Sequence, residues 1–205
     1  MSEGTARKPA NRPSRRKDLI AAGVKLFSLQ SWELVTVADI VERAGMTSAA
    51  FYYHFSSREQ LLQEVVEDFA QYWVSSIRAL LDSADALESI CKVPATLLDE
   101  IDRAQQVARI FFLSAATAPL LVERIHRKAR ADLAEAATAA IHRVAPGRSD
   151  AVATVNGLAM VCLYEMAVRA HLSLDEPYLV LGPRRFRSQL SVLSDMATHD
   201  FTEVR

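Results

Sequence analysis

Hydrophobic side chains recur at helical spacing along almost all of this 205-residue chain. In the segment 18–29, for example, Leu19, Ile20, Val24 and Phe27 fall on one face of a 3.6-residue repeat. No segment shows the alternation of apolar and polar residues that is typical of a strand. The pattern therefore predicts an all-α fold. The expected helices are 18–29, 36–44, 47–54, 58–81, 85–101 with a bend or restart at Pro94, 104–116, 119–144, 150–171 and 184–196, and a loop with Pro177, Gly182 and Pro183 precedes the last of them.

Two short helices joined by a tight turn are predicted near the start of the chain. Thr36 is a good N-cap for the first helix, because Asp39 follows three residues later as in a capping box. Gly45 suits the left-handed residue that ends many helices, and Thr47 is the next good N-cap. This spacing is typical of a helix-turn-helix, in which the second helix, here 47–54, reads a groove of DNA.

A longer pattern of residues surrounds this turn. It consists of Leu26-Phe27, Trp32, Thr36-Val37, Asp39-Ile40, Ala44-Gly45-Met46-Thr47, Phe51-Tyr52-Tyr53-His54-Phe55, Ser57-Arg58-Glu59 and Leu61. The pattern resembles the DNA-binding domain of the TetR family of bacterial transcriptional repressors, and it covers about the first third of the chain. Ser31, Gly23 and Val41 depart from it, because the family usually has glycine, alanine and alanine at these positions.

The resemblance implies how the chain is organised. A basic, disordered arm at 1–15 would precede the helix-turn-helix domain at 16–61, and a larger helical domain at 62–205 would serve effector binding and dimerisation. Phe51 and Phe55 would pin the reading helix to its own core. The positions that contact DNA in the family are occupied here by Thr47, Ser48, Ala49, Ala50, Tyr52, Tyr53, His54 and Arg58.

The residues of this domain are better suited to holding DNA than to reading its bases. First-turn amides of the helices that begin at Thr36 and Thr47 are good phosphate donors, and the forked guanidinium of Arg58 suits a phosphate as well. Residues 48–50 are Ser-Ala-Ala, which cannot form the bidentate base contacts of Arg, Asn or Gln. We therefore expect specificity to rest on thymine methyl groups, DNA shape and the basic arm.

Basic residues are concentrated before the first helix. Residues 1–60 hold nine Lys/Arg against six Asp/Glu, although the whole chain has a net charge of −1. Proline, glycine and serine in the arm disfavour a fold of its own. Two interpretations stay open: a solvated tail, or an arm that follows phosphates or enters a minor groove. The basic residues of the arm are Arg7, Lys8, Arg12, Arg15, Arg16 and Lys17, of which Arg15 and Arg16 are candidate DNA contacts.

Two later helices carry more apolar surface than one buried face requires. Helix 150–171 has Ala153 and Gly157 among larger apolar residues, and small residues let helices approach closely. Helix 184–196 offers Phe186 and Leu190. We expect both helices to pack against a second copy in a four-helix homodimer interface, as in the resembled family; the alternative is that they serve the monomer core alone.

The resemblance also implies a pocket for a small, largely apolar effector in the larger domain. Effector binding would shift the long helix 58–81 and release a dimeric repressor from its operator DNA. The alternative is a DNA-binding helical dimer with a filled core and no small-molecule effector, either constitutive or regulated by a protein partner. The candidate pocket residues are Cys91, Arg103, Phe111, Ser114, Thr117, His126, Asn156, Met160, Cys162, Tyr164 and Glu165.

Other functional classes find little support in the sequence. The five histidines are scattered, and a nucleophile elbow, a phosphate loop and a zinc pattern are all missing, so we expect no enzyme, cofactor or metal. Cys91 and Cys162 are far apart, as expected for buried free thiols in a reducing cytoplasm. No run approaches about 18 uncharged apolar residues, which predicts a cytoplasmic protein without a membrane span.

Overall fold

Helices account for the secondary structure that the chain shows. The computed structural model describes residues 15–113, 120–173 and 176–198, and in these ranges it has α-helices and a short 3-10 helix but no β-strand. The all-α prediction is confirmed for these ranges. Contacts divide the chain into two compact units: the first ends at Leu62 and the second begins at Gln63.

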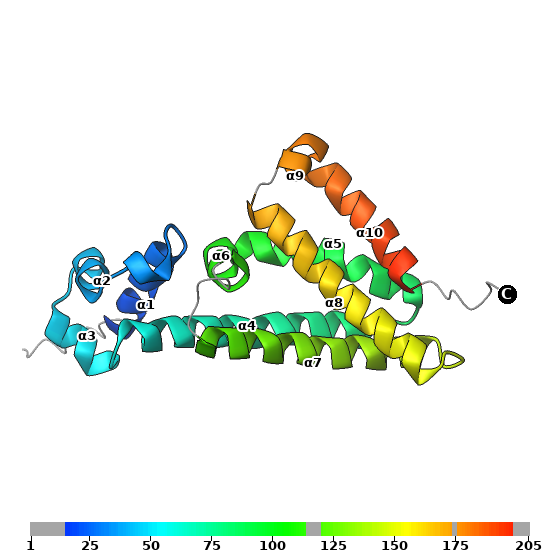
Figure 1. Cartoon of the computed structure of the whole chain (residues 1–205), viewed down its shortest axis with the longest axis horizontal. Helices are drawn as coiled ribbons and strands as arrows, with labels where there is room; N and C mark the ends of the chain where they lie inside the picture. The colour runs from blue at the N-terminus through cyan, green and yellow to red at the C-terminus, as the bar shows by residue number, and fades with distance from the viewer. Residues whose placement is uncertain (1–14, 114–119, 174–175, 199–205) are drawn as a thin grey trace, which may run out of the picture. The chain divides into compact units, whose positions relative to one another are not determined.

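The first unit consists of short helices around an aromatic and aliphatic core. Packing contacts join α1 to α2 and α3, and α2 to α3. Leu19, Phe27, Ile40, Phe51 and Phe55 supply the core, and none of them is more than 2% exposed. The elements are α1 (Arg15–Phe27), η1 (Trp32–Leu34), α2 (Val37–Ala44), α3 (Ser48–His54) and the start of α4 (Arg58–Ser83), which continues into the second unit (Figure 1).

The predicted caps of α2 and α3 are present. Thr36 forms a capping box, because its Oγ1 accepts a hydrogen bond from the Asp39 amide at 3.2 Å while its own amide donates to Asp39 Oδ2 at 2.8 Å. The hydrogen bonds from the Thr36 hydroxyl and amide hold the pKa of Asp39 below its usual value. Gly45 ends α2 with φ 62°, and Thr47 Oγ1 accepts from the Ala50 amide at 3.3 Å. The turn is therefore fixed at both ends.

α1 begins earlier than the hydrophobic pattern predicted. The pattern placed its start at residue 18, whereas the helix starts at Arg15. Arginine and lysine are good helix formers, so the basic residues next to the apolar repeat extend the helix. Arg15, Arg16 and Lys17 therefore belong to α1 and not to the arm, which is a correction. The other arm residues, 1–14, lie outside the described ranges.

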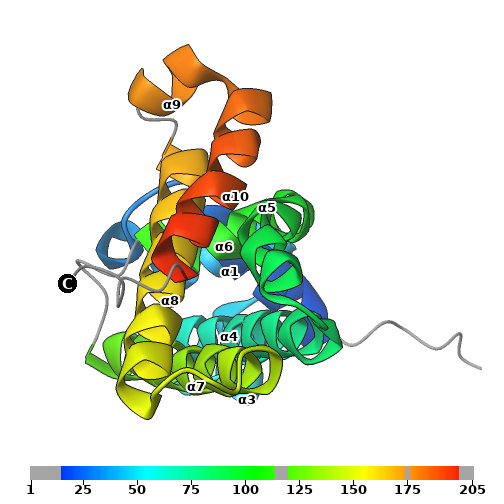
Figure 2. The same ribbon diagram turned by 90° about the vertical axis from the view of Figure 1, so that its right-hand side faces the viewer.

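The second unit packs its helices around the apolar helix α8 (Asp150–Ser173). α8 contacts α5, α6, α7 and α10. Figure 2 shows α8 running from the end of α7 up to α9, with α10 returning beside it. The other elements of this unit are α5 (Leu87–Arg103), α6 (Gln105–Leu113), α7 (Leu120–Val144), α9 (Glu176–Leu181) and α10 (Pro183–Thr198).

Aromatic rings from three helices form the centre of this unit. Phe69 and Trp73 come from α4, Phe111 and Phe112 from α6, and all four are at most 5% exposed. The rings of Trp73 and Phe112 meet edge to face with centroids 5.4 Å apart, and His126 of α7 lies 4.7 Å from Phe111. Edge-to-face contacts of this kind favour one arrangement of the rings over alternatives.

The segment before α10 is helical where the sequence predicted a loop. α9 spans Glu176–Leu181, and α10 starts directly at Pro183. Proline is tolerated in the first turn of a helix, where its missing N–H would have no intrahelical acceptor. Gly182 has φ 75°, which ends α9. Proline and glycine mark helix ends here and not a loop. Pro94 lies inside α5, which is a single helix.

Among the described residues, α8 is long and apolar enough to cross a membrane by length and composition. However, 44% of its apolar window is buried inside the second unit, where four helices contact it. Core helices of soluble proteins meet the same criterion. We therefore interpret α8 as a core helix with one exposed face.

Candidate functional site

α3 exposes one face and anchors itself by the other. Phe51 and Phe55 are buried, with ring centroids 5.6 Å apart, as predicted. On the opposite face Tyr52 is 58% exposed and Tyr53 is 85% exposed. Two exposed aromatic side chains on so short a helix indicate a binding surface. The predicted contact residues that are exposed or half-buried here are Thr47, Ser48, Ala49, Ala50, Tyr52, Tyr53 and His54.

A polar cleft separates the N-termini of α2 and α4, and Tyr52 forms a further part of its wall. Its volume is about 500 Å³. The first amides of a helix have no carbonyl one turn earlier to accept their hydrogen bonds, and the N-terminal end of a helix favours anions. The cleft therefore offers donors suited to a phosphate oxygen. Its lining residues are Thr36, Val37, Tyr52, Ser56, Ser57, Arg58 and Glu59.

Arg58 binds the protein's own backbone, while its contact with a phosphate stays a prediction. Its Nη1 donates to the carbonyl oxygens of Trp32 at 3.3 Å and Glu33 at 3.0 Å, and also to that of Val35. Nε donates to Glu59 Oε1 at 2.9 Å, and the guanidinium lies 4.9 Å from the centre of the Trp32 ring. The side chain thus ties η1 to the start of α4. No local sequence pattern predicts these bonds, because their acceptors lie 23 to 26 residues earlier in the chain.

Arg15 and Arg16 lie in the first turn of α1. Arg15 is exposed, whereas the half-buried guanidinium of Arg16 lies 4.8 Å from the centre of the Phe55 ring. Arg16 therefore packs against the residue that follows α3, and Arg15 is the freer of the two for an external anion. Their contact with DNA stays a prediction.

Comparisons with known proteins identify this unit. A family model described as bacterial regulatory proteins, tetR family, matches residues 19–65. The HTH-type transcriptional repressor KstR2 of Mycolicibacterium smegmatis is 34% identical over 84 residues, which are 41% of this chain and 40% of that repressor. Residues 19–65 therefore carry the DNA-binding domain that this tetR family model describes. KstR2 of Rhodococcus jostii is 27% identical over 115 residues, 54% of this chain and 55% of that protein, so the chain spans about half the length of these relatives.

Solved structures share the fold over nearly the whole chain. The fatty acid degradation regulator FadR from Bacillus halodurans matches 94% of this chain and 98% of its own, with a TM-score of 0.69 and 13% identity. SmeT in its triclosan complex matches 90% of both chains, with a TM-score of 0.73 and 19% identity. At such identities the likeness shows the fold alone. The curated relatives are named transcriptional repressors, which agrees with the expectation that this chain is not an enzyme.

The interior of the second unit contains four of the predicted pocket residues. Cys91, Phe111, Met160 and Tyr164 are each at most 3% exposed. The Tyr164 hydroxyl has no hydrogen-bond partner among the described residues, and burial, followed by the nearby Cys91, raises its pKa above the ordinary value. These residues form a packed interior.

His126 and Glu165 are also predicted pocket residues, and they lie close together where α7 meets α8. His126 is 7% exposed, and its Nε2 is 3.8 Å from Glu165 Oε1. Burial, followed by Arg169 and Arg130, lowers the pKa of His126 to about 4, so the ring is neutral at pH 7. Burial raises the pKa of Glu165, although Arg130 and Arg169 oppose the shift.

The remaining predicted pocket residues are dispersed. Asn156 is buried in α8, whereas Arg103 is an exposed residue that pairs with Glu100 on α5, so Arg103 is not part of the buried interior and its contact with a ligand stays a prediction. Cys162 is exposed, which corrects the expectation of two buried thiols. Ser114 and Thr117 lie outside the described residues.

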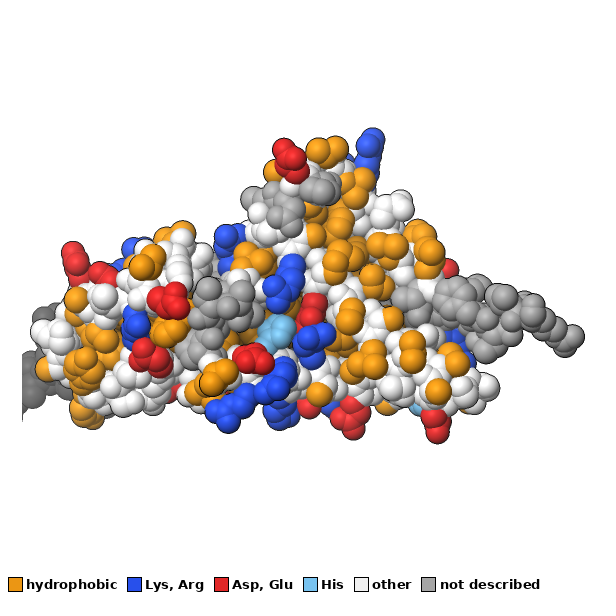
Figure 3. All heavy atoms as spheres, in the orientation of Figure 1, with side chains coloured by type: hydrophobic (Ala, Val, Ile, Leu, Met, Phe, Trp, Pro, Cys, Tyr) orange, Lys and Arg blue, Asp and Glu red, His pale blue; other side chains and the backbone are white. Residues whose placement is uncertain are grey.

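Apolar side chains also gather on the outside of α8 and α10 (Figure 3). Val155 is 63% exposed and Leu158 51% on α8, while Val192 is 51% and Met196 58% exposed on α10. Contiguous exposed hydrophobic surface on a soluble protein is typical of an interaction site.

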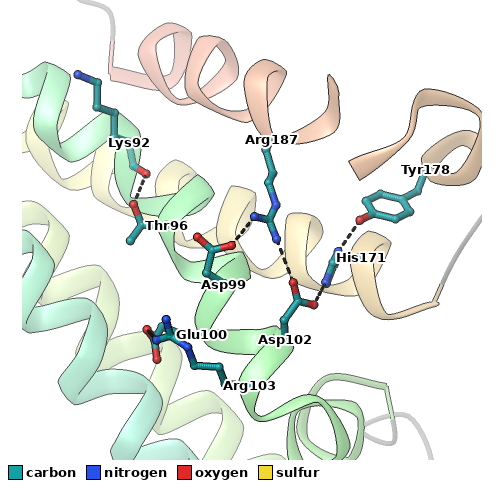
Figure 4. Close-up of polar contacts among 9 residues, drawn as sticks. All are labelled: Lys92, Thr96, Asp99, Glu100, Asp102, Arg103, His171, Tyr178 and Arg187. Carbon is teal, nitrogen blue, oxygen red and sulfur yellow. Dashed lines mark hydrogen bonds and ion pairs between the residues drawn. The ribbon is translucent and has the colours of Figure 1, made fainter. Parts of the chain in front are cut away.

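A polar cluster that the sequence did not predict joins α5, α8, α9 and α10 (Figure 4). Arg187 of α10 donates to Asp102 Oδ2 of α5 at 3.0 Å and also to Asp99. His171 of α8 lies between Asp102 and the Tyr178 hydroxyl, with Nε2 toward the carboxylate and Nδ1 toward the phenol. The cluster fixes α9 and α10 on α5 and α8. Its members had no local signal, because Arg187 and Asp102 are 85 residues apart.

Proposed function

We propose that this chain is a cytoplasmic transcriptional regulator that binds double-stranded operator DNA through the exposed face of α3. The observation that carries the proposal is the capped α2–α3 pair, in which Phe51 is buried while Tyr52 and Tyr53 are 58% and 85% exposed. Phenol hydroxyls and first-turn amides are suitable phosphate donors. Ser48 and Ala49 on the same face are small enough to approach base edges and thymine methyl groups.

Repression is the direction of regulation that the relatives favour. The KstR2 proteins of Mycolicibacterium smegmatis and Rhodococcus jostii are named transcriptional repressors. SmeT, which has the same fold, is described in a complex with triclosan. We extend both features to this chain: it represses transcription, and a small, largely apolar ligand releases it from its operator.

A homodimer is the proposed form that binds DNA. The exposed apolar residues of α8 and α10, among them Val155, Leu158, Val192 and Met196, would pack against the same residues of a second copy. Such an isologous interface would place two reading helices on successive turns of DNA.

A regulator without a small-molecule ligand is the second candidate. The observation that favours it is the dense interior of the second unit, where Phe111, Phe112, Met160 and Tyr164 are at most 2% exposed. A ligand that entered there would have to displace packed side chains, at a cost typical of overpacked cores.

DNase footprinting on the DNA upstream of the chain's own gene tests the proposal. The protein should protect a site of twofold symmetry, and the double variant Tyr52→Phe, Tyr53→Phe should lose affinity because it lacks both phenol hydroxyls. Gln30→Ala, an exposed change between α1 and η1, is the matched control and should bind normally. Absence of protection by the wild-type protein at low salt would refute DNA binding at this site, because phosphate contacts are strongest there.

A further inference from the structure

A second cleft, separate from the packed interior, lies between the C-terminal half of α8 and the segment formed by α9 and the start of α10. Its volume is about 590 Å³, which is within the usual range of about 300–1,000 Å³ for small-molecule pockets. Much of its wall is apolar and comes from Met166 of α8, Leu181 of α9 and Phe186 of α10. These side chains suit a hydrocarbon or aromatic group.

The walls of this cleft are held in place by the polar cluster. Tyr178 lines the cleft and also bonds to His171, and its ring meets that of Phe186 edge to face with centroids 4.9 Å apart. Arg187, next to Phe186, is fixed on Asp102 at 3.0 Å. The cleft is therefore formed before any ligand binds, which reduces the ordering cost of binding.

One positive charge at the cleft is not compensated. Glu165 and Arg169 both line it. Glu165 Oε1 lies 3.2 Å from Arg130 Nε, so this carboxylate is already paired. Arg169 forms no ion pair or hydrogen bond in the part of the chain that the structure describes. His126, which lies behind Glu165, is neutral at pH 7 and adds no charge. At the α7–α8 side of the cleft, Glu165, Arg130 and Arg169 therefore sum to one excess positive charge, apart from the polar cluster in which Arg187 pairs with Asp99 and Asp102.

We propose that this cleft binds a small apolar acid, with its anionic head group on Arg169 and its apolar part against Met166, Leu181 and Phe186. The excess cation selects an anion, and a charge-assisted hydrogen bond to a guanidinium is a strong one. A second copy of the chain is a poorer occupant, because an apolar helix packed over Arg169 would bury an unpaired charge. The proposal names the class of ligand for the proposed function. It rests on that function only for the claim that ligand binding changes the affinity for operator DNA.

Dodecanoate, 1-dodecanol and dodecylamine are suitable probes, because they share a chain and differ in head-group charge. Equilibrium dialysis of the full-length protein should show that dodecanoate binds more tightly than the other two. Arg169→Ala should weaken dodecanoate binding about tenfold, a typical loss for one charge-assisted hydrogen bond. Glu165→Gln should tighten it, because Arg130 then adds a second uncompensated charge. Arg127→Ala on α7, which removes an exposed arginine outside the cleft lining, is the matched control.

Cys162 gives an independent readout, because it lines the cleft and is exposed whereas Cys91 is buried. Bound dodecanoate should slow the reaction of Cys162 with 5,5′-dithiobis(2-nitrobenzoate). Equal affinities for dodecanoate and 1-dodecanol, or equal effects of Arg169→Ala and Arg127→Ala, would overturn the proposal. The proposal would also be overturned if Cys162 were unreactive and dodecanoate bound only after the protein was diluted to monomers, because a second copy would then cover the cleft.

The DNA readout separates this proposal from the proposed function. If dodecanoate binds through Arg169 but operator affinity does not change, the cleft assignment stands and ligand release of the repressor is refuted. If the unliganded protein fails to bind its upstream DNA, the regulatory function is refuted, whereas the dialysis result still decides the cleft.

Discussion

Two substitutions at Arg58 distinguish a structural role from a DNA-contacting role. Arg58→Lys keeps the positive charge but replaces the planar fork with a single amine, which cannot reproduce the bonds to the backbone of η1 and to Glu59 together. Arg58→Ala removes both the charge and the fork. A structural role predicts that both variants destabilise the first unit, whereas a phosphate contact predicts that lysine substitutes well.

The size of the effect follows from the contacts. Nη1 carries two hydrogens, so the three carbonyl contacts amount to about two hydrogen bonds from a charged donor, each with a net value of about 1.5–3 kcal/mol when buried. The side chain is 24% exposed, which reduces this value. Stacking on Trp32 adds about 0.5–1 kcal/mol. We expect a loss of about 3 kcal/mol for Arg58→Ala and about 1–2 kcal/mol for Arg58→Lys.

Amide hydrogen exchange resolved by peptide measures this loss within the first unit. Peptides that cover α2 and α3 should lose protection in both variants, while those from α8 should not change. The slope of log affinity for DNA against log salt should stay constant, because no phosphate contact is lost; a lost contact would reduce it by about 0.9. Arg43→Ala, an exposed arginine at the end of α2, is the control. Wild-type protection in Arg58→Lys, with a reduced slope in Arg58→Ala, would refute the reasoning.

Three further predictions concern the second unit. An added Cβ at Gly157 would lie 2.9 Å from the Thr138 backbone nitrogen, so Gly157→Ala should lower the free energy of unfolding by about 1–3 kcal/mol in urea titrations. Gly147→Ala is the control, because an added Cβ at Gly147 meets no atom, and equal losses in the two variants would contradict this. Leu158→Asp places a charge in the proposed dimer interface and should give monomers in light scattering, whereas Val180→Asp, an exposed change on α9, should not. A dimeric Leu158→Asp protein would exclude the proposed interface. The folded pKa of His126 is about 4 against 6.5 unfolded, so the unfolded chain binds more protons and stability falls as the pH falls from about 6.5 to 4. His126→Phe should make the free energy of unfolding fall less between pH 7 and pH 5 in urea titrations, and an unchanged difference would contradict the burial argument.

Local signals were sufficient where a structural feature depends on neighbours in sequence. The capping box of Thr36 and Asp39, the left-handed Gly45 and the buried Phe51 all follow from residues three or four positions apart. The same rules misread the segment 176–183, because proline and glycine mark helix ends as readily as loops. Tyr178 of α9 bonds to His171, which lies on another helix and helps to hold α9 in place. No local sequence pattern predicts such a contact.

Arg58 and Arg169 show why charged residues are the hardest part of a site to predict. Helical periodicity predicts which side chains face outward, but it does not predict which charges are already paired. Arg58 was expected to hold phosphate, yet its acceptors are carbonyl groups 23 to 26 residues earlier in the chain. The pairing of Glu165 with Arg130 spans two helices, and it leaves Arg169 as the charge open to a ligand. Which ligand such a cleft binds depends on the charges that are left unpaired, and only the tertiary structure determines which charges these are.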